Sequence, residues 1–226
     1  MIKAMMTALA LCVAEQARAD ALQDRVLAGM RVVRADAYAF QRSIAVVREG
    51  AAAKTVVERF DPRRPAAQRW TPVSVDGRAP APKDLERARK AKRDRTPSYA
   101  ELARWFGAPA TRADGPAGYV VYRFARLPAG TLKIGSHDAS ADTSAEALVN
   151  VRGPAPFVER VRFASAKPFR MMMVARVQSI AATARYRPLP DGTPVPLDTA
   201  TDMAGSLMGK AGRMRATATF SGWERR

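Results

Sequence analysis

Side chains that could do chemistry are few in this chain, and they do not form a recognisable catalytic set. The chain has 226 residues with one His and one Cys, which excludes multi-Cys and His-rich metal centres. His137 stands near Asp138 and Asp142 in a polar stretch, a group that could bind a cation weakly. The segment 205–211 hints at a phosphate loop, but it lacks the required spacing and the Ser or Thr after Lys210. The sequence therefore predicts a protein that is not an enzyme and needs no metal or cofactor.

The charge balance points to anionic partners. The chain has 38 Lys and Arg against 21 Asp and Glu, a net charge of +17. Such a surface attracts polyanions. Charge alone would favour nucleic acid, but the aromatic residues lack the pattern of an RNA-binding strand. We expect nonspecific binding at low salt and no specific nucleic-acid partner.

The N-terminus has the pattern of a secretory signal peptide. Lys3 precedes an apolar stretch, and residues 17–19 place small side chains around a cleavage site. We expect cleavage after Ala19, a periplasmic location and one domain over 20–226. Two alternatives stay open: an amphipathic helix of a cytosolic protein, and lipid attachment at Cys12, although Leu11 before it is not the usual small residue.

Hydrophobic periodicity divides the chain into segregated helices and strands. An apolar stripe predicts a helix over 20–37, and two more helices are expected over 83–95 and from Thr96 to Gly107. Period-two alternation predicts a hairpin from Tyr38 to Phe60. Further strands are expected at 68–75, 119–127, 130–136, 147–152, 157–163, 169–186 and 213–220. This order favours an α+β fold with an antiparallel sheet.

This arrangement resembles the LolA/LolB-like superfamily of periplasmic lipoprotein carriers. The resemblance rests on the signal peptide, the N-terminal amphipathic helix, the helical insertion after the third strand and the block from Arg59-Phe60-Asp61-Pro62 to Asp76-Gly77. It implies an incomplete, strongly curved β-barrel, with an N-terminal helix and a helical insertion packed on its concave side. It also implies that acyl chains of a lipid or lipoprotein are held in the hollow.

We therefore predict a monomeric periplasmic carrier of an amphipathic, acyl-chain-bearing ligand. The apolar side chains expected to line the hollow are Phe40, Ile44, Val120, Tyr122, Phe124, Met171, Met173, Met214 and Phe220. The methionines suit a surface that accepts variable apolar shapes. Arg170 and Arg176 are expected at the rim, against an anionic head group. The same methionines could equally be ordinary core.

A second hypothesis needs no hollow. The protein could be an interaction protein of the cell envelope, with its sheet filled by its own helices. Its basic residues, among them the predicted helix over 83–95, would then bind an anionic polymer, an anionic membrane surface or an acidic partner protein.

Overall fold

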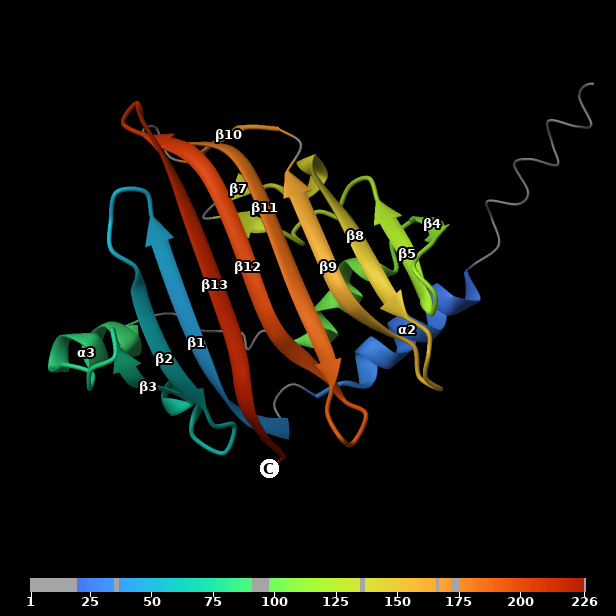
Figure 1. Cartoon of the computed structure of the whole chain (residues 1–226), viewed down its shortest axis with the longest axis horizontal. Coiled ribbons are helices and arrows are strands. Elements are labelled where there is room, and N and C mark those ends of the chain that lie inside the picture. Colours follow the sequence, from blue (N-terminus) through green and yellow to red (C-terminus); the bar gives the residue numbers. More distant parts are fainter. Residues whose placement is uncertain are drawn as a thin grey trace, which may run out of the picture.

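One large antiparallel sheet, open between its two edge strands, dominates the fold (Figure 1). The computed structural model describes residues 20–34, 37–90, 98–134, 137–165, 167–171 and 175–225. The strand order is β3-β2-β1-β13-β12-β11-β9-β8-β5-β4, with β10 paired to β11. All pairings are antiparallel. The predicted α+β class with a curved antiparallel sheet is confirmed.

The strands of this sheet are β1 (Tyr38–Arg48), β2 (Lys54–Phe60), β3 (Trp70–Val75), β4 (Thr111–Asp114), β5 (Tyr119–Phe124), β8 (Thr143–Asn150), β9 (Phe157–Ser165), β10 (Phe169–Met171), β11 (Ala175–Pro188), β12 (Pro194–Leu207) and β13 (Lys210–Arg225). A small separate pair consists of β6 (Lys133–Ile134) and β7 (His137–Asp138). The helices are α2 (Ala21–Val32), α3 (Pro82–Lys90) and α4 (Ala103–Phe106), with short 3-10 turns η3 (Ala66–Gln68), η4 (Tyr99–Leu102) and η5 (Ser140–Asp142).

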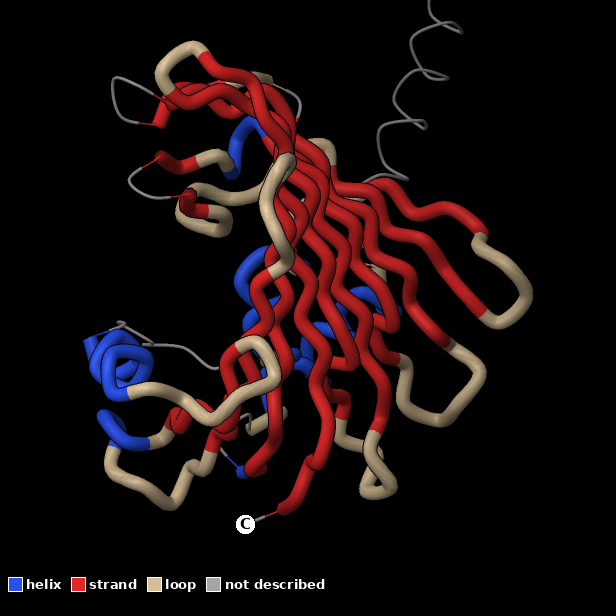
Figure 2. Tube along the Cα trace, turned by 60° about the vertical axis from the view of Figure 1, so that its left-hand side comes forward, coloured by secondary structure: helices blue, strands red, loops and turns tan. Residues whose placement is uncertain are grey.

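The helices α2, α3 and α4 all lie on one face of the sheet, which we call the concave face. Figure 2 shows the sheet bending so that the upper ends of its longest strands curve toward this side. A bulge between Val177 and Ser179 interrupts the pairing of β11 with β12 in this region, and bulges increase local bend and twist. Within the described residues, the other face carries no helix, and we call it the helix-free face.

Helix α2 begins where the sequence predicts it and ends earlier. The Asp20 side chain accepts hydrogen bonds from the backbone N–H groups of Leu22 (3.0 Å) and Gln23 (3.2 Å), which caps the first turn. The helix ends at Val32, because Val33 already has an extended backbone. The predicted end at Ala37 is therefore wrong. Strand β1 then begins at Tyr38.

The main core lies between α2, η4, α4 and the strands β5, β8, β9 and β11. It contains the face of the predicted second helix, with Tyr99, Leu102 and Phe106 all buried. The side-chain amide of Gln23 donates to the backbone oxygens of Phe106 (2.6 Å) and Ala108 (3.0 Å), which ties α2 to the end of α4. The Tyr99 hydroxyl accepts from the backbone N–H of Val158 at 2.7 Å.

One strand prediction is wrong, and two strands were not predicted. The expected single strand over 169–186 is two strands, since β10 pairs antiparallel with β11 and Phe169 lies opposite Val177. The apolar run there contains no Gly or Pro to signal a turn. Strand β12 was not predicted, because its Ala and Thr residues lack a clear apolar alternation. Strand β4 is short, mostly exposed and was also missed.

Several sequence predictions fall outside the described residues. They include the signal peptide with its cleavage site, Cys12, the Thr96 cap, the last part of the helix predicted over 83–95, and Met173. Within the part of the chain that the structure describes, no helix is long and apolar enough to cross a membrane.

Candidate ligand pocket on the concave face

The helix-covered half of the concave face is filled by the protein's own side chains. Val120, Tyr122 and Phe124 on β5 are all buried in the main core. The ring of Phe124 packs edge-on against Trp105 at 5.0 Å, and the ring of Tyr122 packs against Phe106 at 5.6 Å. The structure therefore places these three predicted lining residues in the main core, with Tyr122 and Phe124 against α4, rather than at a free surface.

The hairpin half of the same face is arranged differently. Pairing of β1 with β2 sets side chains opposite each other in successive pairs along this face: Phe40 with Phe60, Arg42 with Glu58, Ile44 with Val56, and Val46 with Lys54. Because side chains alternate between faces with period two, all of these point to the concave side. Arg48 follows next, at the end of β1. The pairs thus change from aromatic to charged, then to apolar, then to basic.

An aromatic cluster lies at the Phe40–Phe60 end of this series of pairs. Phe40, Phe60 and Phe220 are buried together, with Trp70 and Trp223 packed against them. The ring of Phe40 stacks on Trp223 at 4.4 Å and lies 5.2 Å from Phe60. The predicted lining residues Phe40 and Phe220 therefore meet in space, as the end wall of the hairpin region.

A buried ion pair lies next to that wall. The Arg42 guanidinium donates to the Glu58 carboxylate at 2.7 Å, and only 2% of Glu58 is exposed. The guanidinium also sits over the Trp70 ring at 4.1 Å, a cation–π contact. The Arg42 Nε has no hydrogen-bond partner in the described structure. Each charge therefore stabilises the other where water is excluded.

Beyond the ion pair, α3 and the hairpin enclose a pocket of about 430 Å³. Its floor is Ile44, Val46 and Val56, and Ala88 contributes from α3. This volume falls within the range of roughly 300–1,000 Å³ that is usual for small-molecule sites. An apolar floor of this kind can bury an aliphatic chain.

A second pocket of about 280 Å³ opens on the same face, between α4 and the strands β9, β11 and β12. Thr199 lines it, and Ile44 lines the pocket under α3. In the sheet, these two residues are separated by Ala218 alone, which pairs with both. The next row is equally small, with Ala216 between Val46 and Thr201. Small side chains therefore lie between the two pockets in the sheet.

The remaining predicted residues lie away from the apolar floor. Met214 is half-buried opposite Arg48, at the open end of the hairpin. Arg170 and Arg176 lie opposite each other on β10 and β11, both exposed, and neither lines the pocket under α3. Met171 ends β10 opposite Ala175. The structure does not bring Arg170 and Arg176 to the rim of this pocket.

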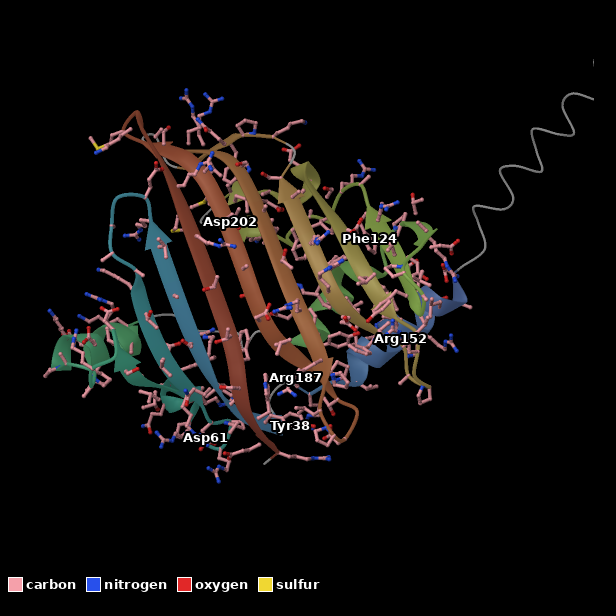
Figure 3. The ribbon with its side chains drawn as sticks, viewed as in Figure 1. Tyr38, Asp61, Phe124, Arg152, Arg187 and Asp202 are labelled. Carbon is pink, nitrogen blue, oxygen red and sulfur yellow. The ribbon has the colours of Figure 1, made fainter. Side chains whose placement is uncertain are left out.

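Another pocket, of about 690 Å³, lies at the lower end of the sheet, between the end of α2 and the turn joining β11 to β12. Tyr38, labelled at that end in Figure 3, donates from its hydroxyl to Asp191 at 2.5 Å and lies 3.0 Å from the Thr193 hydroxyl. The Tyr38 bond, followed by the Thr193 backbone N–H, holds the pKa of Asp191 below its ordinary value. These hydrogen-bonded polar groups form part of the pocket wall, so this pocket is less suited to an aliphatic chain than the pocket under α3.

The candidate chemical groups of the sequence have structural roles. The His137 ring stacks on Phe169 at 4.2 Å. Asp138 accepts from the backbone N–H of Gly130 at 2.7 Å and from Ser140. The segment 205–211 forms the end of β12, a turn and the start of β13, and a phosphate loop would instead lead into a helix. Within the described ranges, no group of three or more His, Cys, Asp or Glu side chains could hold a metal.

Sequence reasoning missed the Arg42–Glu58 pair and the contribution of α3. A signal was present, because Glu58 interrupts the apolar alternation between Val56 and Phe60 just as Arg42 interrupts that between Phe40 and Ile44. Two opposite charges at matching hairpin positions, each inside an apolar face, indicate a buried pair.

Comparisons with known proteins give a structural likeness but no match in sequence. No protein-family model matches the chain, and no curated protein matches it in sequence. Among solved structures, a LolA superfamily protein from Nitrosomonas europaea is similar, with 12% sequence identity and a TM-score of 0.32. The match covers 92% of this chain and 94% of that one.

Proposed function

We propose that the protein is a periplasmic carrier that binds an amphipathic, acyl-chain-bearing molecule on the concave face of its sheet. The observation that carries this proposal is the pocket under α3, with its floor of Ile44, Val46 and Val56. Burying a chain there gains roughly 25 cal/mol for each Å² of apolar surface removed from water, offset by the cost of ordering the ligand.

The small side chains beside the floor support the same proposal. The side chains of Ala218 and Ala216 are short, so they project little from the centre of the concave face. On either side of them lies a pocket with apolar walls. A chain longer than the first pocket could continue across Ala218 toward Thr199. The proposed lining is thus Ile44, Val46, Val56 and Ala218, with Met214 at the open end, while Val120, Tyr122 and Phe124 support the core.

The experiment is to purify the protein gently from a bacterial periplasm and to measure its intact mass under native conditions. An organic extract of the same sample is then analysed by mass spectrometry. The carrier proposal predicts a stoichiometric lipid or lipopeptide. An empty protein that also fails to bind added fluorescent fatty acid would contradict it.

The helix-free face supports a second candidate, binding of an anionic polymer. Arg160 and Arg162 on β9 face this side, and Arg160 lies opposite Arg185. Among the described residues, no carboxylate pairs with Arg160 or Arg162. Salt separates the two functions, because exposed charges are screened within about 8 Å at physiological salt. Binding that disappears at about 0.3 M salt, roughly twice the physiological concentration, supports the polymer. Binding that persists at this salt concentration supports a buried chain.

A further inference from the structure

The mouth of the pocket under α3 has a surplus of positive charge. Five charged side chains line this pocket: Arg48, Lys54, Glu58, Asp84 and Arg87. The two strands of the hairpin supply the first three, and α3 supplies the last two. The charge of the ligand that this pocket favours depends on which of the five side chains already have an ion-pair partner.

Both acids are compensated by partners outside the lining. Glu58 is paired with Arg42 at 2.7 Å. Asp84 accepts from the Arg78 guanidinium at 3.1 Å and from the backbone N–H of Ala81 at 3.0 Å, in the first turn of α3. The Ala81 bond is the main reason that the pKa of Asp84 lies below its ordinary value. Both acids therefore already have a cationic partner that is not part of the lining.

The three bases have no such partners. Among the described residues, no carboxylate lies within ion-pair distance of Arg48, Lys54 or Arg87. Glu49, the acid next to Arg48 in the chain, instead accepts from the backbone N–H of Arg213 at 3.1 Å and lines a pocket on the opposite side. All three basic side chains are exposed.

The hairpin register places two of these charges, Arg48 and Lys54, at a defined end of the apolar floor, while Arg87 lines the same pocket from α3. From the buried Arg42–Glu58 pair, the concave face continues through Ile44 and Val56 to Val46 and Lys54, and then to Arg48. At about 3.4 Å per residue, Arg42 and Arg48 are about 20 Å apart along β1. One end is closed by a neutralised ion pair and an aromatic wall. The other end is open and basic.

From this polarity we infer that the pocket is selective for a single-chain acyl anion, which enters tail first and leaves its carboxylate or phosphate at Arg48, Lys54 and Arg87. This inference rests on the proposed function and adds the class of ligand and its orientation. It also replaces Arg170 and Arg176 as the residues that meet the head group.

The test compares ligands that share a chain and differ in the head. The protein is loaded with the neutral probe N-phenylnaphthylamine at physiological salt. Laurate, lauroyl lysophosphatidate and dodecanol then displace the probe, each below its micelle-forming concentration. The variant is K54Q/R87Q. The matched control is R160Q/R162Q, which removes two positive charges from the helix-free face and leaves the pocket unchanged.

The inference predicts that at least one of the two anions binds the wild-type protein ten or more times as tightly as dodecanol. This preference falls to about one in K54Q/R87Q and is kept in R160Q/R162Q. A preference for the lysophosphatidate over laurate identifies a phosphate head, and the reverse identifies a carboxylate.

Two results would overturn the inference while leaving the binding proposal intact. One is equal affinity of the wild-type protein for dodecanol and both anions. The other is an equal loss of preference in both double variants, which would show a general effect of net charge. Failure of every ligand, dodecanol included, to displace the probe would overturn the binding proposal itself.

Discussion

Ile44 and Thr199 line different pockets, yet in the sheet only Ala218 separates them. Because Ala218 lies between the two pockets, we expect the size of its side chain to control how far a bound ligand can extend. Helices cover the sheet on either side of this row, but the residues of the row itself stay half-buried. The centre of the concave face therefore has space that the main core lacks.

A large side chain at Ala218 is expected to shorten the usable floor. In A218F we predict at least a tenfold loss of affinity for a long-chain acyl anion and a smaller loss for a short-chain one, because only the long chain must cross this position. Probe displacement with a series of chain lengths measures the effect. T219F places the same ring on the helix-free face and should leave all affinities unchanged. Equal losses in both variants would show that the ring disturbs the sheet.

Breaking the Arg42–Glu58 pair is expected to destabilise the fold. E58L leaves the Arg42 guanidinium, which is largely buried, without its carboxylate, and the loss of one partner of such a pair typically costs about 3–5 kcal/mol. Urea denaturation measures the change in the free energy of unfolding. The double variant R42L/E58L removes both charges and should recover most of the loss. A double variant that is as unstable as E58L alone would contradict this account.

Acid stability should depend on Asp191. The Tyr38 hydroxyl and the Thr193 backbone N–H lower its pKa in the folded state, so the unfolded state takes up a proton first as the pH falls. The stabilisation is therefore complete above the ordinary carboxyl pKa and is lost as the pH falls through the lowered value. D191N should reduce the melting temperature at neutral pH and less in acid. The control D202N removes one partner of an exposed ion pair, a kind of pair that contributes little to stability, and should change the melting temperature little at either pH.

Gly205 is expected to be required for the pairing of β11 with β12. A Cβ at this position would lie 2.3 Å from the Arg176 backbone oxygen, so the strands would have to separate. We predict that G205A costs about 1–3 kcal/mol of stability, as overpacking commonly does. Gly212, its partner in the register with β13, has nothing within 4 Å of an added Cβ. If G212A destabilises the fold as much as G205A does, close packing is not the reason.

The sequence predicts the fold well where local chemistry and tertiary packing agree. The Asp20 cap, the hairpin from Tyr38 to Phe60 and the apolar face of the helix around Phe106 all combine a periodic pattern with a clear turn or cap. The reversal between β10 and β11 lacked such a signal.

The site is less predictable, because apolar alternation shows that a side chain points inward but not what covers it. Phe124 and Ile44 both lie on the apolar face of a strand. Trp105 covers the first, whereas the second borders a pocket. That difference depends on where α3 and α4 sit, which is set by contacts between residues far apart in the sequence.

The most direct test of the central claim uses two neighbouring residues of β1 that point to opposite faces. Val46 lines the pocket floor, and Val47 is 44% exposed on the helix-free face. Binding of a fluorescent fatty acid is measured for V46D and V47D, together with the melting temperature of each. We predict that V46D loses binding at least tenfold while its melting temperature stays close to that of V47D, which binds like the wild-type protein. Unchanged binding by V46D, or equal loss in both, would contradict a ligand site on the concave face.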